Sequence, residues 1–288
     1  MSIGQVLKER FRLERLLGVG GVSRVYQACD LLSEQLGEPD PYVAIKVLND
    51  EYAGLPDASL LLYGEFALTR HVHHPNVVHV YQFDVDLAAG RAFFTLELMR
   101  GLTLSQLQRE RPEGLPWPEL RDIAIALLDA LAHSHGSGVL HGDLKPCNVM
   151  LTERGLRLFD FGLGRAEQAP LDGLPQLDRN RCKAWTAAYA APELLEGGVL
   201  TPAADVFAVA CVIHELACGT HPYMRLDALR ARAERLDRSL RVPRHLPAAC
   251  RSALRRALSL DAHERLVSVR ELCKAFQDAP YRADRRWL

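Results

Sequence analysis

The feature that most constrains the fold is a change of hydrophobic periodicity near residue 100 of this 288-residue chain. Before it, short apolar runs separated by turn residues favour strands. These strands are predicted at Phe11–Leu17, Val22–Ala28, Tyr42–Leu48, about Val77–Asp84 and about Ala92–Leu98. Apolar groups at helical spacing predict one helix among them at 58–72, and the polar link at 33–41 is expected to be a loop.

After residue 100 the apolar spacing becomes that of helices. Helices are predicted at Leu104–Arg109, Glu119–His135, 203–217, about 226–236, 246–258 and 267–276. Residues 163–185 have no clear period and are expected to form a surface loop. Strands followed by helices are typical of α+β proteins. We therefore expect two lobes with a cleft between them: an antiparallel sheet lobe with one main helix over residues 1–98, and a mostly helical lobe over residues 99–288.

Composition narrows the class of protein without naming a function. The chain is 48% hydrophobic and 25% charged, with a formal net charge of -1, so no global field favours nucleic acid or a membrane surface as partner. Its seven cysteines form no C-x-x-C pair, which is typical of thiols in a reducing compartment. The longest dense apolar run, Val206–Ile213, is too short to span a bilayer, and the N-terminus has no apolar signal region. We expect a cytoplasmic protein without a membrane span.

One polar loop carries the residue types that phosphoryl transfer requires. His141–Asn148, reading HGDLKPCN, lies between the apolar pairs Val139-Leu140 and Val149-Met150. It contains a carboxylate that can receive a hydroxyl proton, a cation, and an amide oxygen for Mg²⁺, namely Asp143, Lys145 and Asn148. Asp160 follows in an Asp-Phe-Gly segment, and oxygen ligands from Asn148 and Asp160 would suit Mg²⁺. The alternative is that Asp143 and Asn148 merely cap turns.

Two segments of the N-terminal half point to a nucleotide, although each has an ordinary alternative. Glycines in the run Gly18–Val25, G-V-G-G-V-S-R-V, would let backbone N–H groups approach phosphate oxygens, but a simple hairpin turn explains the run equally well. Lys46 interrupts an apolar strand, where an unpaired ammonium is costly. It is either a snorkelling edge-strand lysine or a lysine that pairs with Glu65 and faces nucleotide phosphates.

Together with Ala191-Pro192-Glu193, these segments resemble protein kinases of the eukaryotic-like Ser/Thr class found in bacteria, over about residues 7–276. The resemblance implies one bilobal kinase domain that binds ATP and Mg²⁺, with Mn²⁺ as an alternative metal, and acts on protein substrates in bacterial signalling. The DLKP sequence of the loop, unlike the tyrosine-kinase variants, favours Ser/Thr as acceptor.

The resemblance also implies roles for individual residues. Lys46 would hold the α- and β-phosphates and pair with Glu65. Asp143 would be the catalytic base, Lys145 a γ-phosphate contact, and Asn148 and Asp160 the metal ligands. The remaining cofactor-binding residues would be Gly18, Val19, Gly20, Gly21, Val25 and Ala44, with Leu96 as gatekeeper and Glu97 and Met99 in the hinge. Asp205 would brace the catalytic loop, and Arg265 would pair with Glu193.

Two departures from the family pattern bear on regulation. Ser23 replaces the third glycine of the phosphate loop, with little expected effect. Gly142 stands where most members have an arginine that binds an activation-loop phosphate, and no Ser, Thr or Tyr lies between Gly162 and Trp185. We predict that activity does not depend on activation-loop phosphorylation. Control would then come from a partner, from expression or from a cognate phosphatase, and a constitutively active enzyme is an equal alternative.

Two rival functions and one surface hypothesis stay open at this level. Aminoglycoside and choline phosphotransferases also begin this loop with HGD, but they have a second histidine where this chain has Lys145. A pseudokinase acting as a scaffold typically lacks the lysine, the base or the metal aspartate, and here Lys46, Asp143 and Asp160 are all present. Residues 225–256 contain ten Arg against three Asp/Glu, which indicates either solvated helix faces or a docking surface for an acidic protein.

Overall fold

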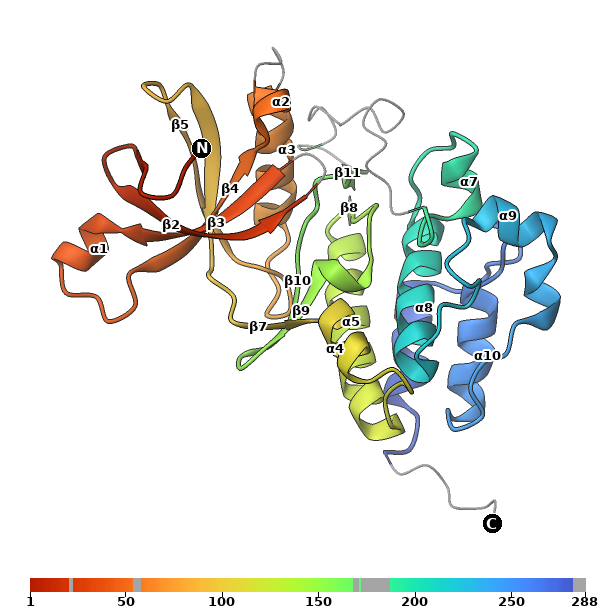
Figure 1. The fold of residues 1–288 in the computed structure, drawn as a ribbon. Coiled ribbons are helices and arrows are strands. Elements are labelled where there is room, and N and C mark those ends of the chain that lie inside the picture. The colour runs from red at the N-terminus through yellow and green to blue at the C-terminus, as the bar shows by residue number, and fades with distance from the viewer. Residues whose placement is uncertain (21–22, 54–57, 168–170, 172–186, 282–288) are drawn as a thin grey trace.

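The computed structural model describes residues 1–20, 23–53, 58–167, 171 and 187–281. Its N-terminal lobe is a six-stranded sheet in the order β1-β2-β3-β4-β6-β5, antiparallel throughout. The strands are β1 Val6–Leu7, β2 Phe11–Val19, β3 Ser23–Asp30, β4 Tyr42–Leu48, β5 Val80–Asp86 and β6 Arg91–Leu96. The short helix α2 Asp50–Ala53 precedes the main helix of the lobe, α3 Ala58–His71. The sheet and α3 stand at one end of the molecule in Figure 1.

Helix α3 is held by an apolar seam because its buried side chains meet one face of the sheet. Leu62 and Phe66 pack against Phe94 and Leu96 of β6 and Ala44 of β4. On the other face, Phe11 and Phe93 meet edge to face at 5.9 Å within a second cluster. The sheet therefore has an apolar cluster on each face, and α3 packs on one of them.

The C-terminal lobe is built from helices around one continuous core. The helices are α4 Leu104–Glu110, α5 Trp117–Gly136, α7 Pro192–Leu195, α8 Pro202–Cys218, α9 Ala228–Ala233, α10 Ala248–Ala257 and α11 Val269–Gln277. Residues 204–217 of α8 are all buried, which is typical of a helix at the centre of a core. Gly219 ends α8 in the left-handed conformation with φ of 72°, where a side chain would be strained.

Two small sheets between the lobes fix the ends of the loop His141–Asn148. Strands β7 Gly101–Thr103, β9 Val149–Thr152 and β10 Gly155–Leu158 form one sheet, and β8 Val139–Leu140 pairs with β11 Arg165–Ala166. The loop therefore leaves β8 and enters β9 through a 3-10 turn, η1 Pro146–Asn148. Short strands at both ends hold a loop more rigidly than coil would.

The predicted α+β, two-lobed fold is confirmed, with local differences. A helix, α1 Leu31–Gln35, occupies part of the expected loop because the Asp30 carboxylate caps it at the Leu32 N–H, 3.1 Å away. The helix expected at 226–236 stops at Ala233, and Leu236–Ser239 forms a separate 3-10 turn, η2, after Arg235 adopts a left-handed conformation. Most of the loop expected at 163–185 lies outside the described residues. Within the described ranges, no helix has both the length and the hydropathy needed to cross a bilayer.

Candidate active site

Lys46 joins three segments that are far apart in the sequence. Strand β4 presents its ammonium to the Glu65 carboxylate of α3, with Nζ to Oε1 at 2.5 Å. The same nitrogen donates to Asp160 Oδ1 at 2.8 Å, on the segment that follows β10. The side chains of Lys46 and Glu65 are each only 9% exposed, whereas that of Asp160 is 36% exposed. The lysine therefore has the paired partner that its apolar strand demands, and it fixes α3 against the cleft.

The charges of this cluster follow from burial and proximity. Burial alone would lower the pKa of Lys46, but the Asp160 and Glu65 carboxylates outweigh it and raise the pKa above its ordinary value. Burial would likewise raise the pKa of Asp160, yet the Lys46 ammonium dominates and lowers that pKa to about 2. Burial raises the pKa of Glu65 above its ordinary value, against the pull of Lys46. Lys46 and Asp160 are therefore both ionised at neutral pH.

The loop between β8 and β9 brings its own acid, cation and amide together. Lys145 Nζ lies 2.5 Å from Asp143 Oδ2, and the Asn148 amide Nδ2 donates to the Asp143 carbonyl at 2.9 Å. Burial would lower the pKa of Lys145, but the adjacent Asp143 carboxylate raises it. Asp143 thus contacts both Lys145 and Asn148, through its carboxylate and its carbonyl respectively.

Asp205 of α8 braces this loop from below. Its Oδ2 accepts from the His141 backbone N–H at 2.8 Å and from His135 Nε2 at 2.9 Å, and its Oδ1 accepts from the Gly142 N–H at 2.9 Å. Its burial would raise its pKa, but hydrogen bonding to His135 and the backbone N–H groups holds the pKa below its ordinary value. One buried carboxylate therefore satisfies three donors at once.

His141 fills the space between the loop and the Asp-Phe-Gly segment as a neutral imidazole. Burial lowers its pKa. Its Nε2 donates to the Phe159 carbonyl at 3.1 Å, and its Nδ1 accepts from the Asp143 N–H at 3.3 Å. Its ring also packs against Phe161, with centroids 4.7 Å apart. One buried side chain therefore joins the loop His141–Asn148 to the Asp-Phe-Gly segment.

The donor set fits a hard divalent cation. The Asn148 amide nitrogen is engaged by the Asp143 carbonyl, so its oxygen remains the acceptor that faces other partners. Asp160 is partly exposed and stays anionic, with one carboxylate oxygen on Lys46. Carboxylate and amide oxygens are the ligands that Mg²⁺ prefers, and phosphate oxygens normally complete its shell. Among the described residues, no cluster of three or more His, Cys, Asp or Glu offers a separate metal site.

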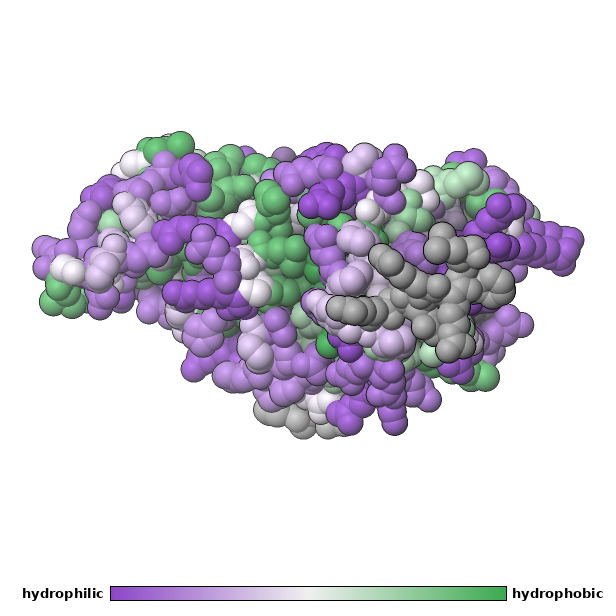
Figure 2. Space-filling model, turned by 90° about the horizontal axis from the view of Figure 1, so that it is seen from below, coloured by the Kyte–Doolittle hydropathy of each residue, from purple (hydrophilic) through white to green (hydrophobic). Residues whose placement is uncertain are grey.

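Five of the residues predicted to hold the nucleotide lie on strands of the N-terminal sheet, namely Gly18, Val19, Val25, Ala44 and Leu96. In the strand register, Gly18 pairs with Val25, Val25 with Lys46, and Ala44 with Leu96. The side chains of Val25, Ala44, Leu96 and Met99 belong to one apolar cluster. Seen from below in Figure 2, hydrophobic residues gather in a band near the junction of the two lobes, while the surroundings are mainly hydrophilic.

The glycine-rich turn of the sheet is only partly described. Val19 is 63% exposed at the end of β2, and the Gly20 N–H donates to the Ser23 carbonyl at 2.7 Å. These bonds close the hairpin that the sequence predicted between β2 and β3. Gly21, which was also expected to contact the nucleotide, lies outside the described residues.

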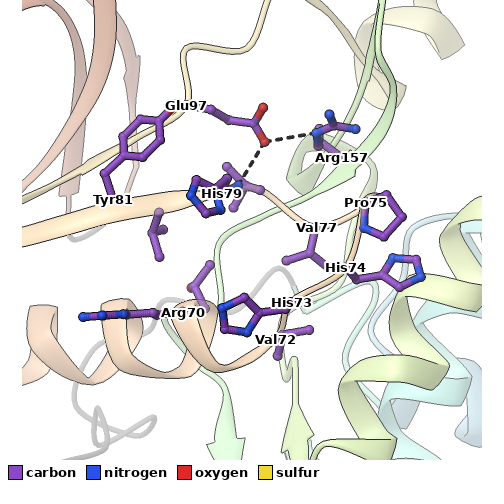
Figure 3. Close-up of a pocket in the computed structure, with 13 residues that line it drawn as sticks. Arg70, Val72, His73, His74, Pro75, Val77, His79, Tyr81, Glu97 and Arg157 are labelled. Atoms are coloured by element: carbon purple, nitrogen blue, oxygen red, sulfur yellow. Dashed lines mark hydrogen bonds and ion pairs between the residues drawn. The ribbon is translucent and has the colours of Figure 1, made fainter.

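The Glu97 side chain, from the predicted hinge, points toward His79 and Arg157. Its carboxylate accepts from the His79 N–H at 2.9 Å and from Arg157 Nε at 3.0 Å, in the wall of a cavity of about 430 Å³ (Figure 3). Its own N–H donates to the His79 carbonyl at 2.9 Å. These bonds fix Glu97 to His79, the residue before β5, and to Arg157 of β10, so the hinge backbone is held in place beside Leu96.

Two further ionic groups support the helical lobe. Arg265, whose side chain is fully buried, donates to Glu193 at 2.6 Å and to the Ala203 carbonyl at 2.9 Å, as the resemblance implied. Sequence reasoning missed the buried Glu215, which binds Tyr189 Oη and Arg225 Nη2. A glutamate inside the apolar run of α8 was the available signal, because a buried carboxylate requires partners.

This arrangement of a sheet lobe, a helical lobe and a lysine–glutamate–aspartate cluster between them is the architecture of protein kinases. A family model described as protein kinase domain matches residues 11–277, so the chain belongs to the protein kinase family.

Comparison with individual proteins agrees. The chain is similar to the DNA damage-responsive serine/threonine-protein kinase RqkA of Deinococcus radiodurans, with 37% identity over 228 residues, 78% of this chain and 32% of that protein. It is 32% identical to the serine/threonine-protein kinase PkaA of Streptomyces coelicolor over 270 residues, 89% of this chain and 47% of that protein. The crystal structure of the Mycobacterium tuberculosis PknI kinase domain matches with a TM-score of 0.68 and 25% identity, over 96% of this chain and 98% of that one. The chain thus spans about a third to a half of the length of these two curated relatives.

Proposed function

We propose that this chain is a serine/threonine protein kinase that transfers the γ-phosphate of ATP to Ser or Thr hydroxyls of proteins. The observation that carries the proposal is the buried Lys46 ammonium, which bridges Glu65 at 2.5 Å and Asp160 at 2.8 Å. A cation fixed by two carboxylates at the edge of a cleft is preorganised for phosphate oxygens, and such positioning supplies most of the catalysis in phosphoryl transfer. The family membership and the names of the relatives support the same activity.

In this proposal each polar side chain of the cleft has one task. Lys46 holds the α- and β-phosphates while Glu65 keeps its ammonium in place. Asp143 accepts the proton of the acceptor hydroxyl, and Lys145, 2.5 Å from it, contacts the γ-phosphate. The pair holds one positive charge near the moving group and one base near the nucleophile.

The proposed cofactors are ATP and Mg²⁺, with Mn²⁺ as an alternative metal. Asn148 and Asp160 would hold the metal through oxygen atoms, and the metal would neutralise charge on the phosphates. The apolar cluster that contains Val25, Ala44 and Leu96 supports an adenine site, and the hinge backbone at Glu97 and Met99 would hydrogen-bond the base. Gly18, Val19, Gly20 and Gly21 would cover the phosphates.

Partners, location and regulation belong to the same proposal. Protein substrates are expected, together with a regulatory partner or a cognate phosphatase. A cytoplasmic site of action is supported by the free state of the cysteines in the described residues, which suits a reducing compartment. Gly142 and the sequence 163–185, which has no Ser, Thr or Tyr, support activity without activation-loop phosphorylation.

The test is transfer of labelled phosphate from ATP with Mg²⁺ to a generic protein acceptor, comparing wild type with Asp143→Asn. We expect wild type to label the acceptor and Asp143→Asn to lose ~10²-fold or more of the rate. Asp122→Asn is the matched control, because it makes the same chemical change at a carboxylate on α5 that is 60% exposed and has no proposed part in phosphate transfer. Its activity should equal that of wild type.

Negative outcomes separate the rival functions. ATP binding by wild type without any labelled protein would favour a pseudokinase scaffold and reject the proposal. Labelling of a small alcohol or aminoglycoside in preference to protein would favour a small-molecule phosphotransferase. Equal labelling by wild type and Asp143→Asn would reject the role of Asp143.

A further inference from the structure

The arginine-rich segment of the helical lobe divides into two parts with different partners. From residue 238 to residue 260 the sequence contains six Arg and no Asp or Glu. Three of the four arginines before this stretch are paired with carboxylates in the structure: Arg225 with Glu215 at 2.5 Å, Arg230 with Glu234 at 3.8 Å, and Arg232 with Glu196. The charge-rich helix face at α9 is therefore largely neutralised locally, and Arg230 and Arg232 are poor candidates for binding an acidic partner.

The second part, residues 238–260, contains arginines that lack carboxylate partners among the described residues. Arg241, Arg244, Arg251 and Arg255 form no salt bridge within the described ranges of the chain. Arg251 and Arg255 are four residues apart on α10 and so lie on one face, about 6 Å apart along the axis. Arg251 Nη1 donates to the Arg244 carbonyl at 3.3 Å, which fastens the loop 240–244 to that helix face. Four arginines therefore lie close together, and none of them forms an ion pair with a carboxylate of the described residues.

These arginines line two adjoining cavities rather than a flat surface. One cavity of about 380 Å³ is lined by Val242, Arg244, Arg251, Ser252 and Arg255. The other, of about 720 Å³, is lined by Leu240, Arg241, Val242, Pro243, Arg244 and Arg255. Arg244 and Arg255 belong to both, and the buried Val242 contributes an apolar wall. We call this pair of cavities the arginine groove.

The shape and charge of the arginine groove favour an extended ligand that carries several carboxylates. Guanidinium groups bind carboxylates through two parallel hydrogen bonds, and gathering several without anions is unfavourable by mutual repulsion. Because the charges are spread over two connected chambers, a single small anion would meet only part of them. An extended chain with several carboxylates would reach both chambers and also cover the apolar wall. In Figure 1, α10 lies on the far side of α8 from β8, so the groove is separate from the catalytic loop.

We propose that the arginine groove docks an acidic segment of the protein substrate, at a distance from the hydroxyl that receives phosphate. This inference rests on the proposed kinase function, since it assigns a specificity surface to it. Docking would lower the KM for substrates that carry an Asp/Glu-rich segment, and it would leave kcat nearly unchanged because the groove does not contact the cleft residues.

The test uses two synthetic peptides with the same acceptor serine and a flexible linker, one ending in six Glu and the other in six Gln. For wild type we expect the KM of the Glu peptide to be ~5–10-fold lower than that of the Gln peptide, with the gap closing at high salt. The double variant Arg244→Glu/Arg255→Glu should erase the gap while its rate on the Gln peptide stays at the wild-type level. Arg238→Glu is the matched control, because Arg238 is an exposed arginine of the same segment outside the groove lining.

Direct binding keeps this test independent of turnover. The anisotropy of a fluorescein-labelled six-Glu peptide should rise with wild type and Arg238→Glu, but not with the double variant or with the milder Arg241→Gln/Arg251→Gln. Equal KM values for the two peptides, or equal peptide binding by all variants, would overturn the inference. Binding to phosphatidylserine vesicles without peptide binding would also overturn it and assign the groove to an anionic membrane surface. Loss of activity on both peptides with retained peptide binding would reject the kinase function alone.

Discussion

Replacing Asp205 by asparagine tests whether the brace beneath the catalytic loop has the energetic role that its geometry indicates. All three of its partners are donors: the N–H groups of His141 and Gly142 and the His135 ring nitrogen. An asparagine amide carries one acceptor oxygen and one NH₂ group, so in either orientation the NH₂ faces a donor. In the better orientation the oxygen serves His141 and His135, and the buried Gly142 N–H is left without an acceptor.

The cost of Asp205→Asn follows from these contacts. A charge-assisted hydrogen bond is lost and a buried N–H is left unsatisfied, which together reduce the free energy of unfolding by about 2–4 kcal/mol. For a chain of this size we expect the melting temperature to fall by roughly 3–7 °C. Because the loop that holds Asp143 loses an anchor, kcat should also fall by roughly 10- to 100-fold.

The assay combines urea and thermal unfolding with peptide phosphorylation for wild type, Asp205→Asn and Asp122→Asn. The control, an exposed carboxylate on α5, should stay within about 0.5 kcal/mol of wild type. A change in melting temperature below about 2 °C together with an unchanged kcat would refute the reasoning, since it would mean that the three donors find other acceptors.

The same variant has a pH signature with a defined sign. The pKa of Asp205 is held below its ordinary value in the fold. Its ionised form therefore contributes stability above the unfolded pKa of about 3.9, and this contribution is lost as the pH falls through the lower folded value. The stability difference between wild type and Asp205→Asn should be full at neutral pH and shrink below about pH 4.

Three further outcomes are expected. Lys46→Met removes the cation that contacts both Glu65 and Asp160, so the rate of phosphate transfer should fall by ~10²-fold or more in the labelled-ATP assay. A variant that keeps half of the wild-type rate would exclude a phosphate-binding role for Lys46. Arg265→Leu leaves the Glu193 carboxylate without its buried partner and should cost about 3–5 kcal/mol in urea unfolding; a loss below about 1 kcal/mol would contradict the pairing. Treatment of the purified protein with a phosphatase should leave its rate unchanged, and a large loss would show that a phosphate activates it.

Much of this fold was predictable because the patterns were local. The strands of the first lobe and the helices of the second could be predicted from the spacing of apolar residues alone. The lysine inside β4 was expected to have a partner, because an unpaired buried ammonium is costly. Asp143, Lys145 and Asn148 are close in sequence, so their proximity in space needed little tertiary information. The contact of Lys46 with Asp160, 114 residues apart, was not predicted, since the family resemblance implied only the pairing of Lys46 with Glu65.

The features that escaped prediction depend on contacts across the chain. The two-residue strand β11 lies at the start of the segment expected to be a loop, and it forms only by backbone pairing with β8, which leaves no sequence period. Helix α1 depends on one cap by Asp30 within a stretch that otherwise has loop composition. The sequence also could not show which arginines of 225–256 are paired, because Glu196 and Glu215 come close to Arg232 and Arg225 only in the folded chain.

Gly142 has a left-handed backbone, with φ of 77°, at the position where the family resemblance led us to expect an arginine. A residue with a side chain would be strained there by about 1–2 kcal/mol, and glycine is not. Glycine therefore leaves the peptide unit directly before Asp143 relaxed. A Gly142→Arg substitution would therefore strain the loop that Asp205 holds, so an arginine cannot be introduced at this position without a cost in stability.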